Sequence, residues 1–258
     1  MNVDRSEPGA PRPGGGGDVA IIGMACIFPG AANLDAYWHN IVSGVDAITD
    51  VPPGRWDPEV FFDPNSSSPG RVYCKRGGYL GDLARCNPLE YGIMPVVMEA
   101  GEPDQILSLR VAHEALADAG YATRPFNRER TEIILGRGNY SNRAYHTVTL
   151  HTLGIEETLQ VVQSLYPEHS AEELEALRRE LRANLPPFNP DTAGTLIPNL
   201  TTGRVANRLD LMGANFTVDA ACASALIALD LAVRDLQTGR CDLALVGAVH
   251  LEIGRAHV

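Results

Sequence analysis

The sequence has little positive charge and no long hydrophobic run. The first argues against a nucleic-acid-binding protein, and the second argues against a membrane-spanning one. Its 258 residues carry 21 lysines and arginines against 32 aspartates and glutamates, which gives a formal net charge of −11. Nucleic-acid binding usually needs clustered basic residues to meet phosphates, so we expect no nucleic-acid partner. The longest early apolar run, Val19 to Phe28, is too short to cross a bilayer and is interrupted by Gly23. We therefore expect no membrane span.

The sequence also lacks the cysteine and histidine spacings that are typical of metal sites. No Cys-x-x-Cys pair and no zinc-like histidine partner occur among the five cysteines, which are Cys26, Cys74, Cys86, Cys222 and Cys241. His146 and His151 do not share a helical face at their spacing. We expect no metal site. An odd number of cysteines without a secretory segment favours reduced thiols and a cytoplasmic location, with every cysteine except Cys222 interpreted as a packing residue.

A glycine-containing stretch from Leu135 to Ser141 is superficially similar to a phosphate-binding loop. Ser141 replaces the third glycine of that motif, and no clear helix pattern begins after it. We therefore expect no dinucleotide cofactor.

Apolar periodicity predicts an α/β protein behind a short leader. Three prolines and a four-glycine run make residues 1–17 too poor in apolar side chains to fold, so this segment is expected to be disordered. Ser170 and Glu173 form a capping-box pattern at the start of a helix. The expected elements are helix 104–119, strand 131–135, strand 215–218, helix 222–237 and strand 243–249. Alternating helices and strands predict a mostly parallel sheet that helices cover.

Cys222 lies where an apolar extended run meets a helical run. The strand 215–218 precedes it, Ala221 and Ala223 flank it, and a helical pattern of leucines and valine continues to Gly239. The unpaired N–H groups and positive dipole end of a helix N-terminus favour a thiolate. This effect contributes roughly 0.3–1 kcal/mol, so acyl transfer at Cys222 would still need a base and an oxyanion hole from elsewhere in the fold.

The segment Asp219–Ser224 resembles the active-site cysteine motif of the β-ketoacyl synthases, the condensing enzymes of fatty acid and polyketide assembly. Other segments resemble the same family in order and spacing: Val19–Ala25 with Phe28–Ala31, Tyr37–Trp38, Gly203–Asp210 and Asp242–Val249. In this resemblance Val19–Ala25 is the family's opening strand and Tyr37–Trp38 lies in its first helix. Cys222 is then the nucleophile.

Two further segments are most like one branch of that family. Tyr73–Leu80 and Asn87–Ile93 resemble the ketosynthases of polyunsaturated fatty acid synthases and of iterative type I polyketide synthases. The run Gly101–Ile106 replaces the Asp-Pro-Gln-Gln-Arg run of ordinary modular polyketide synthases, so that Ile106 stands in place of an arginine.

The resemblance implies a thiolase-like fold with α-β-α-β-α layers, of which this chain holds approximately the N-terminal half. Residues 18–251 are then the truncated synthase domain, and residues 252–258, which depart from the family, are interpreted as a non-native tail. Two catalytic histidines and a supporting lysine are expected beyond the end of this chain. The family also implies a homodimer.

The resemblance further implies a decarboxylative Claisen condensation. Cys222 would hold an acyl chain as a thioester, its backbone N–H would supply part of the oxyanion hole, and a malonyl-carrier thioester would be the second substrate. No cofactor is expected to bind directly, because an acyl carrier protein delivers the phosphopantetheine arm. A basic patch for that partner could come from Arg137, Arg143, Arg204 and Arg208, although solvated surface arginines are the alternative.

Two other functions remain open from the sequence. A thiolase-like acyltransferase would use the same cysteine without malonyl decarboxylation, and a second catalytic cysteine downstream would favour it. A non-catalytic dimerisation or docking fragment would show no preferential modification of Cys222. The truncated chain by itself is expected to have little or no condensing activity.

Overall fold

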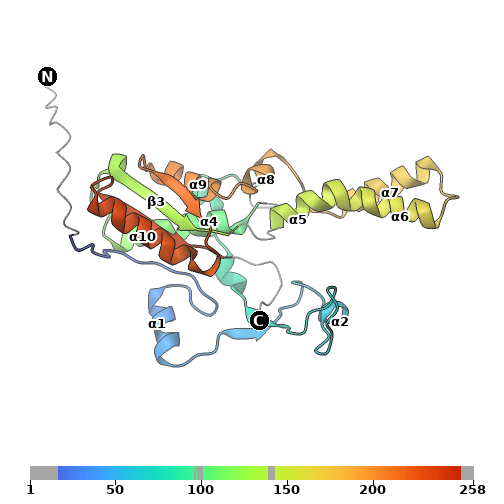
Figure 1. The fold of residues 1–258 in the computed structure, drawn as a ribbon, viewed down its shortest axis with the longest axis horizontal. Coiled ribbons are helices and arrows are strands. Elements are labelled where there is room, and N and C mark those ends of the chain that lie inside the picture. Colours follow the sequence, from blue (N-terminus) through green and yellow to red (C-terminus); the bar gives the residue numbers. More distant parts are fainter. Residues whose placement is uncertain (1–16, 96, 98–100, 139–142, 251–258) are drawn as a thin grey trace, which may run out of the picture.

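The computed structural model describes residues 17–95, 97, 101–138 and 143–250, and a three-stranded parallel sheet lies at its centre (Figure 1). Strand β3 (Thr131–Gly136) pairs with β4 (Asn215–Val218) on one side and with β5 (Leu243–Ala248) on the other. Every residue of β3 is buried. This burial is the expected state of a central parallel strand that is covered on both faces.

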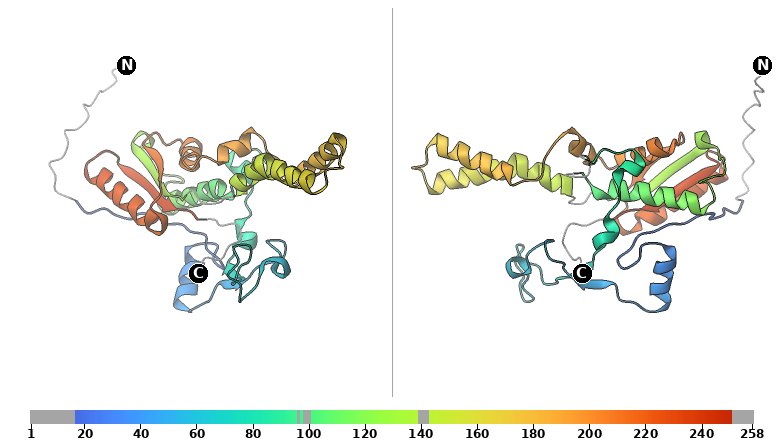
Figure 2. Two further views of the ribbon diagram at one scale, coloured as in Figure 1. Left: turned by 45° about the vertical axis from the view of Figure 1, so that its right-hand side comes forward. Right: turned by 180° about the vertical axis from the view of Figure 1, so that it is seen from behind.

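Helices cover both faces of this sheet. Successive side chains of β3 point to opposite faces, so the two sets of side chains pack against different helices. Ile133 and Leu135 pack with α4 (Pro103–Asp118) and α9 (Leu200–Leu209) in the larger core cluster. Ile134 packs on the other face against α10 (Ser224–Gln237). Figure 2 shows α4 crossing the back of the sheet, opposite α10.

Smaller elements make up the segment that precedes α4. It contains α1 (Leu34–Val42), β1 (Ile48–Asp50), α2 (Pro58–Phe61) and β2 (Arg76–Gly78), and β1 and β2 form an antiparallel pair. The first helix implied by the family resemblance is confirmed as α1. Asn33 begins α1 by accepting a hydrogen bond from the Ala36 N–H at 3.0 Å.

A helical arm projects from the body between β3 and α8 (Pro190–Thr195) (Figures 1 and 2). One side of the arm is a continuous helical path made of three parts, namely α5 (Arg143–Thr149), a π-helical turn (Leu150–Gly154) and α6 (Ile155–Leu165). The other side is α7 (Ala171–Ala183), which the predicted capping box of Ser170 and Glu173 begins. The sequence shows no clear helix pattern after Ser141, but in the structure α5 begins at Arg143.

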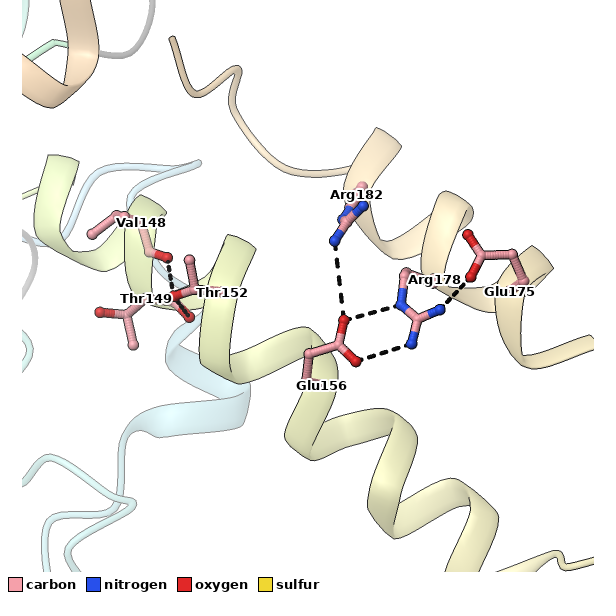
Figure 3. A network of polar contacts seen from close by, with 7 residues as sticks. All are labelled: Val148, Thr149, Thr152, Glu156, Glu175, Arg178 and Arg182. Carbon is pink, nitrogen blue, oxygen red and sulfur yellow. Dashed lines mark hydrogen bonds and ion pairs between the residues drawn. The ribbon is translucent and has the colours of Figure 1, made fainter. Parts of the chain in front are cut away.

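An ion-pair network ties the two sides of the arm together (Figure 3). Glu156 on α6 accepts hydrogen bonds from Arg178 on α7 at 3.0 and 2.9 Å, and Arg178 also contacts Glu175. Arg182 lies 4.0 Å from the same Glu156 carboxylate. The hydrogen bonds that Arg178 donates to Glu156 lower the pKa of Glu156.

The prediction of an opening strand at Val19–Ala25 was wrong, because the structure has no strand there. This segment lies against the C-terminal part of α4 instead. A Cβ on Gly23 would be 2.5 Å from the Ala115 carbonyl oxygen, and the Met24 N–H donates to Asp118 at 2.8 Å. The segment is thus held on α4 by a close backbone approach and not by strand pairing. The predicted leader 1–17, apart from Gly17, and the predicted tail 252–258 lie outside the described residues.

The remaining predicted elements are confirmed with small shifts. Helix 104–119 is α4, and strand 131–135 is β3, which extends to Gly136. Strand 215–218 is β4, and strand 243–249 is β5, which ends one residue earlier.

The amino end of β3 holds a buried acid beside a buried thiol. Glu132 is 2% exposed, and its Oε1 atom has no hydrogen-bond partner. Burial raises the pKa of Glu132, and burial together with Glu132 raises the pKa of Cys241 to about 12. Cys241 is therefore an inert packing residue, as the sequence predicted.

We expect Arg178→Ala to loosen the arm without unfolding the body. The change removes the bonds that cross from α7 to Glu156, so amide hydrogen exchange should quicken in α6 and α7 and stay unchanged in β3. Acidification should have the same effect on the arm, because the lowered pKa of Glu156 means that its contribution to stability is lost as pH falls through the folded-state pKa. Arg179→Ala, at the adjacent exposed position, is the control. Equal exchange in both variants would contradict the role of the network.

We also expect Glu132→Gln to reduce the pH dependence of folding. The raised pKa of Glu132 means that its contribution to stability is complete below the unfolded-state pKa and is lost as pH rises through the folded-state pKa. The free energy of unfolding of Glu132→Gln, relative to the unmodified protein, should therefore increase between acidic and neutral pH. Urea unfolding at several pH values measures this, and a constant difference would argue against a raised pKa of Glu132.

Candidate functional site

Cys222 lies at a sharp corner between β4 and α10. The chain leaves β4 at Val218, takes a positive φ of 49° at Ala221, and forms a short 3-10 turn over Ala221–Ala223 before α10 begins at Ser224. A left-handed conformation is unfavourable for alanine, so surrounding contacts must hold it. The predicted strand-to-helix corner is confirmed, although α10 begins two residues after Cys222, at Ser224.

Side-chain hydrogen bonds hold this corner in place. The Ser224 hydroxyl donates to the Ala221 carbonyl oxygen at 2.7 Å and accepts from the Ala220 N–H at 2.8 Å. The Asp219 carboxylate accepts from the Ala221 N–H at 3.0 Å. Together these bonds satisfy the backbone groups on both sides of the strained residue, and Ser224 itself is buried.

Gly136 at the end of β3 sets how closely α10 can approach the sheet. A Cβ at this position would lie 2.8 Å from both the carbonyl carbon and the Cβ of Ser224. Only glycine permits this contact without a shift of the helix. The carboxyl end of the central strand therefore lies directly beneath the start of α10.

Cys222 is the exposed thiol of the five cysteines, all of which lie in the described part of the chain. Cys26 and Cys86 are half-buried, and burial raises the pKa of both thiols. Ala223, the N-cap residue of α10, has no side chain that could accept from the N–H groups of the first turn. Cys222 thus combines access to solvent with the positive end of a helix.

Cys222 also borders a wide apolar hollow. Segment 17–29, β5 and one side of α10 line this hollow, with Leu226, Leu229, Val233 and Leu236 on α10. Its volume of about 3160 Å³ is several times the roughly 300–1,000 Å³ of a closed ligand pocket, so it is an open surface and not a finished binding site. Small residues of α10 pack on the sheet, whereas the leucine and valine stripe that predicted the helix faces this hollow.

Two of the described histidines contact groups away from Cys222. His113 packs edgewise on Tyr91, and the His151 Nε2 atom lies 2.8 Å from the Pro186 carbonyl oxygen, which fixes Nε2–H as the donor. His250, which the sequence did not favour, lies at the carboxyl end of β5 and lines the same hollow as Cys222. Among the residues that the structure describes, no group of three metal-binding side chains occurs.

The basic patch that these four arginines could have supplied does not form among the three whose side chains the structure describes. Arg137 is 3% exposed and donates to the Asp104 carboxylate at 2.5 Å, so it was wrongly placed among surface arginines. Arg204 is half-buried and donates to Gln105 at 3.1 Å. Arg208 is exposed, and the side chain of Arg143 lies outside the described residues. Ile106, which stands in place of the arginine of modular synthases, is buried in the core beside α9.

Comparison with known proteins identifies the family. The family model "Beta-ketoacyl synthase, N-terminal domain" matches residues 17–258. The chain belongs to the β-ketoacyl synthase family. It is 32% identical over 231 residues to one subunit of the polyunsaturated fatty acid synthase of Thraustochytrium, and the match covers 89% of this chain and 8% of that protein. It is also 32% identical over 235 residues to polyketide synthase ThaG of Burkholderia thailandensis, and this match covers 91% of this chain and 4% of that protein.

Solved ketosynthase structures agree with this assignment. The oxazolomycin ketosynthase domain of Streptomyces albus superposes with a TM-score of 0.64 at 27% identity, over 90% of this chain and 35% of that one. The ketosynthase from module 6 of the Bacillus subtilis bacillaene synthase gives a TM-score of 0.62 at 28% identity, over 91% and 32% of the two chains. The ketosynthase chain described here therefore has the predicted thiolase-like α/β fold. It spans about a third of those structures and under a tenth of the two synthases above.

Within the described residues, no helix is both long and apolar enough to span a bilayer.

We expect Ser224→Ala to destabilise the corner of this ketosynthase domain. The change leaves the Ala220 N–H and the Ala221 carbonyl without their partner, which should lower the free energy of unfolding by about 1–3 kcal/mol. Urea unfolding monitored by circular dichroism measures the loss. Ser164→Ala, at an exposed position on α6, is the control and should change stability by less than about 0.5 kcal/mol. Equal stability of the two variants would show that the hydroxyl does not hold the corner.

Proposed function

We propose that Cys222 is the acyl-accepting nucleophile of a β-ketoacyl synthase in a polyketide or fatty acid synthase, an enzyme of the acyltransferase class. The observation that carries this proposal is an exposed thiol at the N-terminal end of α10, beside an apolar hollow. The names of the relatives, a polyunsaturated fatty acid synthase and a polyketide synthase, support the substrate class.

In the first proposed step, the Cys222 sulfur attacks the thioester carbonyl of an acyl chain on a carrier protein. The new bond joins Cys222 to the acyl carbon, and the carbon–sulfur bond to the phosphopantetheine arm breaks. The proton of Cys222 passes to the departing thiolate, which leaves as the free thiol of the arm. The Cys222 N–H supplies part of the oxyanion hole, where a donor stabilises the charge that develops on the carbonyl oxygen.

In the second proposed step, a malonyl thioester on the carrier protein loses carbon dioxide. The electron pair of the broken bond attacks the acyl carbon on Cys222, and the Cys222 thiolate leaves. One carbon–carbon bond forms and the sulfur is ready to accept another acyl chain. No organic cofactor is needed within the chain, because the carrier protein brings the phosphopantetheine arm.

The domain limits, partners and location are part of the same proposal. Residues 18–251 form the N-terminal part of the ketosynthase domain, preceded by the leader 1–17 and followed by the non-native tail 252–258. The intact enzyme is a cytoplasmic homodimer that receives substrates from an acyl carrier protein. The chain described here should show little or no condensation by itself, since it spans only about a third of the solved ketosynthase chains that it matches.

We expect the chain to be acylated at Cys222 by a small acyl thioester that mimics the end of a phosphopantetheine arm. Intact-protein and peptide mass spectrometry should find one acyl group, on Cys222, since this thiol is exposed at a helix start. Cys222→Ala should abolish the adduct. Cys86→Ala, which removes a half-buried thiol, is the matched control and should leave it unchanged. Equal acylation of Cys222→Ala, or no preference of iodoacetamide for Cys222, would favour the docking fragment instead.

A further inference from the structure

Two unusual stretches of the sequence meet in the structure. Asp104 belongs to the run that replaces the modular-synthase pattern, and Arg137 belongs to the glycine-containing loop after β3 that matched no cofactor motif. The Arg137 Nε atom donates to the Asp104 Oδ2 atom at 2.5 Å, and the two side chains are 3% and 9% exposed. The two stretches are therefore joined by a buried ion pair between a carboxylate from one and a guanidinium from the other.

This pair is part of a polar layer, which we define as the buried residues Asp104, Gln105 and Arg137 with the half-buried Arg204. Gln105 is 1% exposed and accepts a hydrogen bond from Arg204 on α9. The layer connects the first turn of α4 with α9 and with the carboxyl end of β3. Asp104 Oδ1, Gln105 Nε2 and Arg137 Nη1 are buried without a hydrogen-bond partner.

Such a pair is a poor source of stability. Burial raises the pKa of Asp104 while the Arg137 guanidinium acts in the opposite direction, so the cost of desolvation is large. Apolar side chains of similar size often replace buried ion pairs with no loss of stability. A role in fixing one precise geometry explains the pair better than a role in holding the fold together.

The geometry that the pair can fix is that of the Cys222 corner. The Arg137 N–H donates to the Val218 carbonyl oxygen at 3.0 Å, which ties Arg137 to the last residue of β4. The preceding residue, Gly136, lies beneath Ser224. The backbone of Gly136 and Arg137 thus touches the chain on both sides of Cys222.

We propose that the Asp104–Arg137 pair positions Cys222, by fixing the carboxyl end of β3 beneath the turn that carries this thiol. This inference rests on the proposed function of Cys222. Asp104 and Arg137 are positioning residues, because they act through Gly136, Val218 and Ser224 and do not contact the thiol.

The test compares the reactivity of Cys222 with the stability of the protein, in the full 258-residue chain. The variant Asp104→Leu/Arg137→Met replaces the ion pair by apolar side chains, and it should fold with a melting temperature at or above that of the unmodified protein. Iodoacetamide should nevertheless alkylate Cys222 about two- to fivefold more slowly, which is the rate equivalent of losing the helix-terminus interaction. Peptide mass spectrometry gives the rate at Cys222, and the rate at Cys74 should not change.

Two further variants complete the test. Arg130→Met removes an ion pair with Asp242, whose closest atoms lie 2.9 Å apart at the opposite end of β3, and it should leave the rate at Cys222 unchanged. Asp104→Asn leaves the Arg137 charge buried, so it should lower both stability and the rate.

Three results would overturn the proposal. These are a wild-type rate at Cys222 in the folded double variant, failure of the double variant to fold, and an equal slowing in Arg130→Met. Absence of preferential alkylation in the unmodified protein would instead contradict the proposed function of Cys222.

Discussion

The close approach of α10 to the end of β3 is the constraint on which the site depends. Gly136 has no side chain, so Ser224 can lie against the backbone of the central strand. That contact brings the Ser224 hydroxyl within reach of the Ala220 N–H and the Ala221 carbonyl oxygen. The same bonds keep Ala221 in its left-handed conformation and leave Cys222 exposed at the turn. A larger residue at position 136 would move the helix start and the thiol together.

The two ends of β3 show how one strand supports opposite environments for cysteine. At the amino end, Cys241 is buried beside Glu132, and burial together with Glu132 raises the pKa of Cys241 to about 12. At the carboxyl end, Cys222 meets solvent and the N-terminus of a helix. In parallel α/β sheets ligands bind outside the carboxyl ends of the strands, where loops are exposed and helix N-termini point. The position of each thiol along the sheet therefore decides whether it is buried or exposed.

The corner could be predicted from the sequence because local patterns define it. A short apolar strand, small residues around Cys222 and a helical stripe up to Gly239 are signals within a few residues of one another. The burial of Arg137 could not be predicted in this way, since an arginine is usually exposed and its partner Asp104 is distant in sequence. The prediction of the opening strand was wrong because it, too, depended on contacts with residues distant in sequence. Val19–Ala25 has high strand propensity, but strand propensity depends strongly on context, and here Gly23 packs on α4 instead of pairing with a strand.

The helix after Ser141 was hidden by its composition. Thr147, Val148 and Thr149 are β-branched and disfavour helix, and the path continues through a π-helical turn that breaks the regular spacing. Tertiary contacts then hold the arm, including the Glu156–Arg178 bonds and the His151 contact with Pro186. The arm thus depends on contacts between residues distant in sequence, whereas the Cys222 corner depends on contacts between neighbours and one glycine. This difference explains why the candidate site was more predictable from the sequence than the arm.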